Sequence, residues 1–299
     1  MPLDIMLPFW GDPAMMRETV ESVLRQTSDD WLLTVVDDAY PDPSVKEYFD
    51  GLTDPRVSYV RKDVNEGITA NFATCAQIAT QDMVAIVGCD DVLLPNYVDT
   101  VLRAHRDFPE ADIIQPGVQV IDESGAVVTT LVDSVKRRLM MPRVSQPTLL
   151  TGEALATSLL RADWLYWPSL VFRRERLVAT SFRDEFSLIQ DLALIIDMIC
   201  AGATLLVEPT LCFSYRRHGS SASSAALLDG VRFDGERRYF AVAAGEMSRR
   251  GWRRARRAAR LHMTSRLHAV VLLPQAFSRK EGSPKALLRH AFGPALPDR

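Results

Sequence analysis

The amino-acid sequence predicts an α/β fold with a mostly parallel sheet flanked by helices. Over the first 110 residues, apolar runs of strand length alternate with segments of helical periodicity, as crossovers between parallel strands require. Four of these runs lead into polar residues, which a parallel sheet would gather at one edge, where open α/β sheets bind ligands. The runs are residues 3–8, 31–36, 56–60 and 83–87. This pattern favours a nucleotide-binding enzyme.

Helices are expected between these strands. Pro13 and Pro95 each suit the first turn of a helix, where a missing N–H costs no hydrogen bond. After Pro13, apolar residues between 16 and 24 recur at the spacing of one buried helical face. Further helices are expected near 44–51 and over 69–80.

The second half of the chain has a different pattern. Extended segments at 113–121 and 127–132 predict a hairpin or an edge addition, and the polar, basic and aperiodic stretch 133–150 predicts a loop. The remaining elements expected are a helix from Thr151, a strand at 169–172, an apolar helix at 187–201 that Gly202 ends, strands near 204–207 and 211–215, and helices after Leu227.

Composition indicates a globular protein with a sizeable core. The 299 residues are 47 % hydrophobic, which is enough for one large domain or one domain with an appendage. The four cysteines form no Cys-x-x-Cys pair and no zinc-finger pattern, so we expect reduced thiols in a cytosolic protein. The N-terminal residues lack a secretion signal and no apolar run approaches the length of a membrane span, so a cytoplasmic location is expected.

Charge is divided unevenly along the chain. Residues 245–299 hold 13 Lys+Arg against 3 Asp+Glu, whereas residues 1–244 hold 22 against 35. Within the basic part, residues 248–268 contain eight arginines and no acid, with large apolar residues interspersed. Such a helix could lie on an anionic membrane surface at the inner face, or it could pair with the acidic body or a dimer partner. Nucleic-acid binding is disfavoured because the body is acidic and no recognition module is visible.

Two pairs of adjacent carboxylates stand at predicted strand ends. Asp37-Asp38 follows the second strand and Asp90-Asp91 follows the fourth. Adjacent carboxylates repel each other and a divalent cation is the usual compensation, so Asp90-Asp91 indicates a metal-bound phosphate. The alternative is that one of these aspartates caps the helix at Pro95 and the other is solvated, while Asp37-Asp38 belongs to a turn.

Five motifs follow one another in the first hundred residues. They are Pro8-x-Trp10, Ser22-Val23-Leu24-x-Gln26-Thr27, Val35-Val36-Asp37-Asp38, Asn65-Glu66-Gly67 with Asn71, and Asp90-Asp91 with Pro95. Their order and spacing resemble the donor half of family 2 glycosyltransferases of GT-A fold. The resemblance implies a Rossmann-like GT-A domain over residues 1–225, with a donor half at 1–110 and an acceptor half at 111–225. Residues 226–299 are then a helical, Arg-rich C-terminal extension.

The resemblance also implies roles at the nucleoside. Pro8 and Trp10 belong to the segment that follows the first strand, and Trp10 would lie against the nucleobase. Asp38 would accept a hydrogen bond from a base N–H. Asn65 and Gly67 would lie near the nucleoside, where glycine permits close backbone approach.

The resemblance further implies a metal site for Mg or Mn at the donor diphosphate. Asp90 matches the last acid of the family's Asp-x-Asp motif, and Gly88 replaces its first acid, so Asp91 is a second candidate ligand. The segment ending in His218 is similar to the family's Tyr-Arg-x-His segment, which implies that His218 completes the metal site or meets the diphosphate. Arg216 in the same segment would bind phosphate oxygens. A histidine in a loop is otherwise usually just solvated.

On the acceptor side, Asp191 resembles the acid of the family's Glu-Asp motif at the start of an apolar helix, with Gln190 replacing Glu. The resemblance implies that Asp191 takes the proton of the attacking hydroxyl. The alternative is a carboxylate that interacts with a helix N-terminus. Trp164 and Trp167 fall where the family builds its acceptor pocket, although an aromatic cluster of this size is often core.

Together these observations predict a metal-dependent, inverting glycosyltransferase of hexosyltransferase type. The donor expected is a nucleotide-diphosphate sugar, with UDP or dTDP favoured, and the acceptor is a hydroxyl of a glycan or of a lipid-linked substrate in polysaccharide assembly. Two alternatives are a nucleotidyltransferase of related fold and a non-catalytic scaffold that binds nucleotide sugars. The first should carry a Gly-rich basic loop after the first strand, which residues 8–12 lack.

Overall fold

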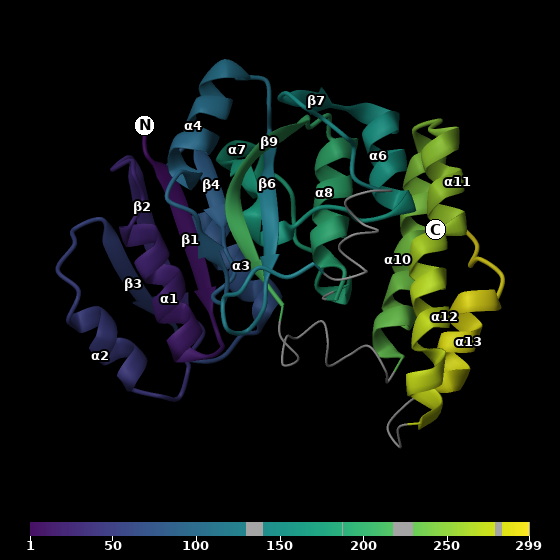
Figure 1. Cartoon of the computed structure of the whole chain (residues 1–299). Coiled ribbons are helices and arrows are strands. Elements are labelled where there is room, and N and C mark those ends of the chain that lie inside the picture. The colour runs from purple at the N-terminus through teal and green to yellow at the C-terminus, as the bar shows by residue number, and fades with distance from the viewer. Residues whose placement is uncertain (130–139, 187, 218–229, 279–282, 299) are drawn as a thin grey trace.

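The computed structural model describes residues 1–129, 140–186, 188–217, 230–278 and 283–298 (Figure 1). Its donor half shows the predicted alternation of strands and helices. The strands are β1 (Leu3–Phe9), β2 (Trp31–Asp37), β3 (Val57–Arg61) and β4 (Met83–Ile86), followed by the short β5 (Val92–Leu93). The helices are α1 (Pro13–Leu24), α2 (Ser44–Asp50), α3 (Ile68–Ile78) and α4 (Tyr97–Asp107). Pro13 opens α1 as predicted, behind an Asp12 side chain that accepts the N–H of Ala14 at 2.7 Å.

The acceptor half departs from the predicted elements at several points. Its strands are β6 (Ile113–Ile121), β7 (Thr148–Leu150), β8 (Val171–Arg173) and β9 (Leu205–Arg216). β6 has the predicted bounds, and the chain returns beside it through an antiparallel bridge between Ile121 and Val127, while residues 130–132 of the predicted second segment lie outside the described part of the chain. β7 lies inside the stretch predicted as a loop, of which residues 133–139 are outside the described part of the chain. The two strands predicted near 204–207 and 211–215 form one continuous strand, β9.

All nine strands belong to one sheet in the order β3-β2-β1-β4-β8-β6-β9-β5, with β7 paired to β9. Pairing is parallel from β3 through β4 and between β6 and β9, whereas β5, β7 and β8 are antiparallel to their neighbours. This confirms the predicted mostly parallel sheet flanked by helices. The register pairs Phe9 with Asp37 and Met6 with Ile86, so the carboxyl ends of β1, β2 and β4 lie at one edge.

Helices complete the acceptor half and the C-terminal region. They are α6 (Gly152–Arg161), α7 (Arg174–Val178), α8 (Gln190–Cys200), α10 (Val231–Arg249), α11 (Arg253–Leu261), α12 (Met263–Ser278) and α13 (Pro284–Phe292), with 3-10 turns η2 (Trp167–Ser169) and η3 (Asp184–Phe186). The predicted helix at 187–201 thus begins at Gln190. None of the described helices combines the length and the apolar character needed to cross a membrane.

The C-terminal helices share a core with the acceptor half. Tyr239 and Met247 of α10 and Ala259 of α11 belong to the same buried cluster as Leu159 of α6 and Leu192 of α8. Figure 1 shows α10 to α13 on the side of the molecule opposite β3 and α2. The predicted boundary at 225/226 lies outside the described residues, so the division into a GT-A domain and an extension stays a prediction.

A β-bulge in β9, opposite Gly117 of β6, gives a test of this architecture. At Gly117 the pairing with β9 shifts register, and a Cβ atom there would lie 2.6 Å from the carbonyl oxygen of Thr210 and 2.7 Å from that of Pro209. We expect Gly117→Ala to lower the free energy of unfolding by about 1–3 kcal/mol because backbone atoms must move. Gly235→Ala in α10, where a Cβ meets nothing within 4 Å, is the control and should be neutral or stabilising. Equal midpoints of urea unfolding for the two variants would contradict this account.

Candidate active site

The ends of β1 and β2 form an aromatic corner. Trp10 follows β1 and is 51 % exposed, with the edge of its ring against Tyr40 at 5.4 Å between centroids. Pro8, within β1, pairs with Val36 of β2. The buried Asp37 accepts the N–H of Tyr40 at 2.7 Å, which fixes the turn that carries this ring. An exposed, braced tryptophan at this position is available to stack on a planar ligand.

Asp38 is joined to the predicted nucleoside segment. Its buried carboxylate accepts the backbone N–H groups of Glu66 at 3.1 Å and Gly67 at 2.9 Å, and Lys62 Nζ lies 3.3 Å from it. Gly67 has φ +87°, a conformation that favours glycine, and Asn65 Oδ1 accepts its N–H at 3.0 Å. The structure therefore brings Asp38, Asn65 and Gly67 together. A carboxylate has about four lone-pair positions, so contact between Asp38 and a base stays a prediction.

Cys89 links this corner to the acid pair. The backbone of Trp10 is hydrogen-bonded to the Cys89 thiol. Burial, and after it the negative charge of Asp90, raises the pKa of Cys89 to about 12. Since Cys89 directly precedes Asp90, the predicted base-binding residue Trp10 and the predicted metal ligand Asp90 are near neighbours.

Asp90 and Asp91 converge over Gly88. Asp91 is buried, and its Oδ1 accepts the backbone N–H of Arg216 at 2.8 Å, while its Oδ2 has no hydrogen-bond partner in the described structure. A Cβ built on Gly88 would lie 2.4 Å from that Oδ2 and 2.9 Å from Asp90 Oδ1. Burial raises the pKa of Asp91 well above its usual range, the charge of Asp90 raises it further, and Arg216 opposes both effects.

This acid pair fits a hard divalent cation such as Mg or Mn. Both carboxylates offer oxygen ligands, and the buried unpartnered oxygen of Asp91 is the kind of atom that a cation would satisfy. Protein sites for Mg usually supply one or two carboxylates and leave the other positions to water and substrate phosphate. The described residues contain no group of three or more His, Cys, Asp or Glu able to hold a metal. His218, the third predicted ligand, lies outside those residues.

Arg216 has a different role from the one predicted. Its side chain is 1 % exposed, and its guanidinium donates to the carbonyl oxygens of Asp90 at 2.6 Å, Glu123 at 3.0 Å and Asp122 at 3.2 Å. It also pairs with Glu18 of α1 at 2.6 Å. A buried guanidinium bonded in this way does not face a diphosphate. The structure instead makes Arg216 a positioning residue for the loop that carries Asp90.

Asp191 lies in the first turn of α8 and is partly buried. Burial, together with the charges of Asp91, Asp90 and Asp191 and against that of Arg217, raises the pKa of Tyr215 to about 12. All three carboxylates therefore lie within electrostatic reach of one phenol. Tyr166 packs against the same ring at 5.5 Å between centroids. Whether the three carboxylates share one cleft stays a prediction.

The two predicted acceptor tryptophans lie in different surroundings. Trp164 is fully buried, and its Nε1 donates to Ser158 Oγ at 3.0 Å, so it belongs to the core and does not line an acceptor pocket in this structure. Trp167 is 8 % exposed and packs against Phe72 and Phe172. Its Nε1 is buried without a hydrogen-bond partner among the described residues. Trp167 therefore stays the candidate on the acceptor side.

Three residues of the site were not predicted as ligand-binding or positioning residues. Tyr40 packs against Trp10, Lys62 bridges Asp38 and Glu66, and the pKa of Tyr215 is raised by the charges of the three carboxylates. Tyr40 and Lys62 come just after β2 and β3, and Tyr215 is the second-last residue of β9. Inspection of the residues at the carboxyl end of every parallel strand would have found all three.

Comparison with known proteins identifies the family. The family model described as Glycosyl transferase family 2 matches residues 4–154, which is half of the chain. The chain belongs to glycosyltransferase family 2. This membership favours sugar transfer over both the nucleotidyltransferase and the scaffold alternatives.

Relatives of this glycosyltransferase include two bacterial proteins. It is 29 % identical over 105 residues to the glycosyl transferase WcaA of Escherichia coli (strain K12), provisionally assigned to colanic acid biosynthesis, over 35 % of this chain and 37 % of that protein. It is 24 % identical over 154 residues to EpsE of Bacillus subtilis (strain 168), provisionally named a glycosyltransferase, over 50 % of this chain and 51 % of that protein. The matches thus span about half or less of those relatives.

Solved structures support the GT-A fold. The structure of residues 1–349 of S. aureus TarS superimposes with a TM-score of 0.66 at 13 % identity, over 98 % of this chain and 81 % of that one. The same protein in complex with UDP-GlcNAc gives a TM-score of 0.64 at 13 % identity, over 93 % of this chain and 73 % of that one. At this identity the likeness shows the fold alone.

A substitution at Gly88 tests whether the two carboxylates beside it form the metal site. Gly88→Ala places a methyl group against Asp91 Oδ2 and Asp90 Oδ1 and must displace both carboxylates. We expect Mn affinity, measured calorimetrically in the presence of UDP, to fall about 10- to 100-fold. Gly235→Ala controls for the loss of a glycine, and Mn affinity unchanged in Gly88→Ala would remove this pair as the metal site.

Proposed function

We propose that this glycosyltransferase moves a sugar from a nucleotide-diphosphate sugar to a hydroxyl of a glycan or lipid-linked acceptor, with Mg or Mn and with inversion at the anomeric carbon. UDP or dTDP is the favoured nucleotide, and polysaccharide assembly at the cytoplasmic membrane face is the setting. The observation that carries the proposal is the convergence of Asp90 and Asp91 over Gly88, beside the Trp10 corner of the same sheet edge.

In the proposed donor site, Trp10 stacks on the base and Tyr40 holds the tryptophan in place. Asp38 accepts a hydrogen bond from the base, while its two bonds to backbone N–H groups order the segment from Asn65 to Gly67 beside the ribose. A TarS structure of the same fold holds UDP-GlcNAc, which supports a UDP-linked donor.

At the diphosphate, Asp90 and Asp91 would hold the cation, with His218 as a further candidate. When bound, the cation neutralises the negative charge that develops on the leaving nucleotide diphosphate. Asp90 is the more exposed of the two carboxylates and is the one expected to face the substrate. Arg216 keeps it there through the bond from its guanidinium to the Asp90 carbonyl.

On the opposite side, Asp191 accepts the proton of the acceptor hydroxyl as that oxygen attacks the anomeric carbon. One direct displacement opposite the leaving diphosphate inverts that carbon. Asp191 suits this task because it is only partly buried, and its charge acts on Tyr215 together with the charges of Asp90 and Asp91. Trp167 is placed to help shape the acceptor side, between the donor half at 1–110 and the acceptor half at 111–225.

Removal of the proposed base should separate catalysis from donor binding. We expect Asp191→Asn to lower Mn-dependent turnover of a UDP-sugar about 10²- to 10⁴-fold while UDP affinity stays within about twofold, because the amide cannot take a proton. Asp197→Asn in the same helix is the matched control, since Asp197 pairs with Arg183 at 2.6 Å and should affect stability more than rate. Wild-type turnover in Asp191→Asn would refute the assignment.

The proposed base-binding carboxylate is tested by ligand-linked stabilisation. Saturating UDP with Mn should raise the unfolding free energy of the wild type, by about 2.7 kcal/mol at a hundred times Kd. Asp38→Ala should lose most of this increment, because it removes both the base contact and the anchor of the Gly67 segment. Glu66→Gln, which alters only the exposed partner of Lys62, is the control. A full thermal shift in Asp38→Ala would be incompatible with the proposed role.

A further inference from the structure

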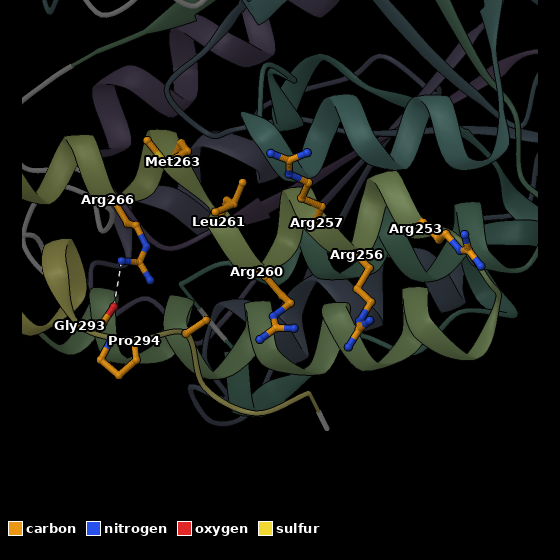
Figure 2. A pocket seen from close by; sticks show the side chains of 10 residues that line it. Arg253, Arg256, Arg257, Arg260, Leu261, Met263, Arg266, Gly293 and Pro294 are labelled. Carbon is orange, nitrogen blue, oxygen red and sulfur yellow. Dashed lines mark hydrogen bonds between the residues drawn. The ribbon is translucent and has the colours of Figure 1, made fainter.

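Helix α11 has an inner face of alanines and an outer face of arginines. Ala255, Ala258 and Ala259 are buried in the core. On the outer face, arginines recur at positions i, i+3, i+4 and i+7, a spacing at which a helix usually carries apolar residues. These arginines are Arg253, Arg256, Arg257 and Arg260. With Arg266 and the segment 293–295 they line a groove of about 720 Å³ (Figure 2), which we call the arginine groove.

The charge of the arginine groove is largely uncompensated. Asp298 pairs with Arg256 at 2.7 Å and lies 3.8 Å from Arg260. Arg253 and Arg257 have no ion pair with any residue that the structure describes. Among the described residues, Asp298 is the one carboxylate that forms ion pairs with the five guanidinium groups, while Glu153 accepts the backbone N–H of Arg254 beside them, so the groove is suited to an anionic partner.

Exposed apolar side chains continue from one end of the arginine groove. Leu261 and Met263 line the groove itself and are 45 % and 61 % exposed. Leu267 and Val271 follow at steps of four residues along α12 and are 61 % and 65 % exposed. Residues four apart lie on the same side of a helix, so Met263, Leu267 and Val271 form one apolar stripe.

We propose that the arginine groove and the apolar stripe dock the protein on an anionic lipid surface. The arginines would contact headgroup phosphates, and the stripe would enter the boundary with the acyl chains, which is how cationic amphipathic helices bind membranes. Figure 1 shows these helices on the side opposite β2 and β3, so docking leaves the proposed nucleobase site away from the lipid. This inference goes beyond the proposed function and does not require it.

Other partners fit this surface less well. A two-fold dimer through the same face would set each arginine groove near its own copy, and like charges would repel. A soluble polyanion would satisfy the arginines and leave the apolar stripe in water. An anionic lipid surface satisfies both parts at once.

Co-sedimentation with vesicles tests the docking. We expect binding to vesicles that contain phosphatidylglycerol, none to phosphatidylcholine alone, and weaker binding as salt rises. Arg253→Gln with Arg257→Gln should weaken the partition about tenfold or more. Arg103→Gln with Arg106→Gln, which removes the same charge from exposed positions of α4, is the matched control. Both variants should keep the Mn-dependent turnover of the wild type, so that a failure of docking is distinguishable from a failure of the proposed activity.

Separate variants test the contribution of the apolar stripe. Leu267→Ser with Val271→Ser should reduce the fraction of protein that stays bound to vesicles at high salt, where the charge contribution is screened. Val178→Ser, which changes an exposed apolar residue elsewhere on the surface, is the control. Equal binding to neutral vesicles, no binding to either vesicle, or equal behaviour of the groove and control variants would overturn the proposal. Binding of inorganic polyphosphate without vesicle binding would also overturn it and would reassign the groove to a soluble polyanion.

Discussion

The buried guanidinium of Arg216 is the interaction on which the arrangement of this site depends. A buried charge is tolerated only when its donors are bonded, and here they reach α1, the loop after β4 and the turn after β6. The backbone N–H of the same residue bonds the Asp91 carboxylate. One residue of the last strand thereby ties the acceptor half to the donor half at the point where the acids meet.

The acid pair is held in an electrostatically unfavourable state by this framework. Asp91 has one oxygen bonded and one oxygen buried without a partner in the described structure, and its neighbour Asp90 carries the same charge. Folding alone does not relieve that repulsion, but a divalent cation held by Asp90 and Asp91 would. The glycine that departs from the family motif is thus the residue that gives the two carboxylates room.

Much of the fold could be predicted from the sequence because the spacing of apolar residues follows which side chains are buried. The runs that became β1, β2 and β4 are buried on both faces, and the polar residues after them lie at one edge as predicted. The two strands predicted at 204–207 and 211–215 are one strand, β9, which contains Pro209, although proline in a strand normally argues against one. The bulge opposite Gly117 accommodates this proline, and it depends on a neighbour almost a hundred residues away.

The site was predicted less completely, because side-chain environment is a tertiary property. Nothing in the local sequence distinguishes Arg216, which is buried and fully bonded, from an arginine that faces phosphate. Trp164 and Trp167 are three residues apart, yet one is core and the other keeps an unpartnered N–H. Lys62 and Tyr40 gain their roles only through pairing of β2 with β3 and packing on Trp10.

The common core of α10, α11, α6 and α8 has a consequence for protein engineering. A chimera joined just after β9 would cut through a single packed interior instead of exchanging two modules. Any graft of the C-terminal helices onto another catalytic scaffold must therefore carry the α6 and α8 surfaces with it, and the helices and their scaffold are expected to evolve as one cooperative unit.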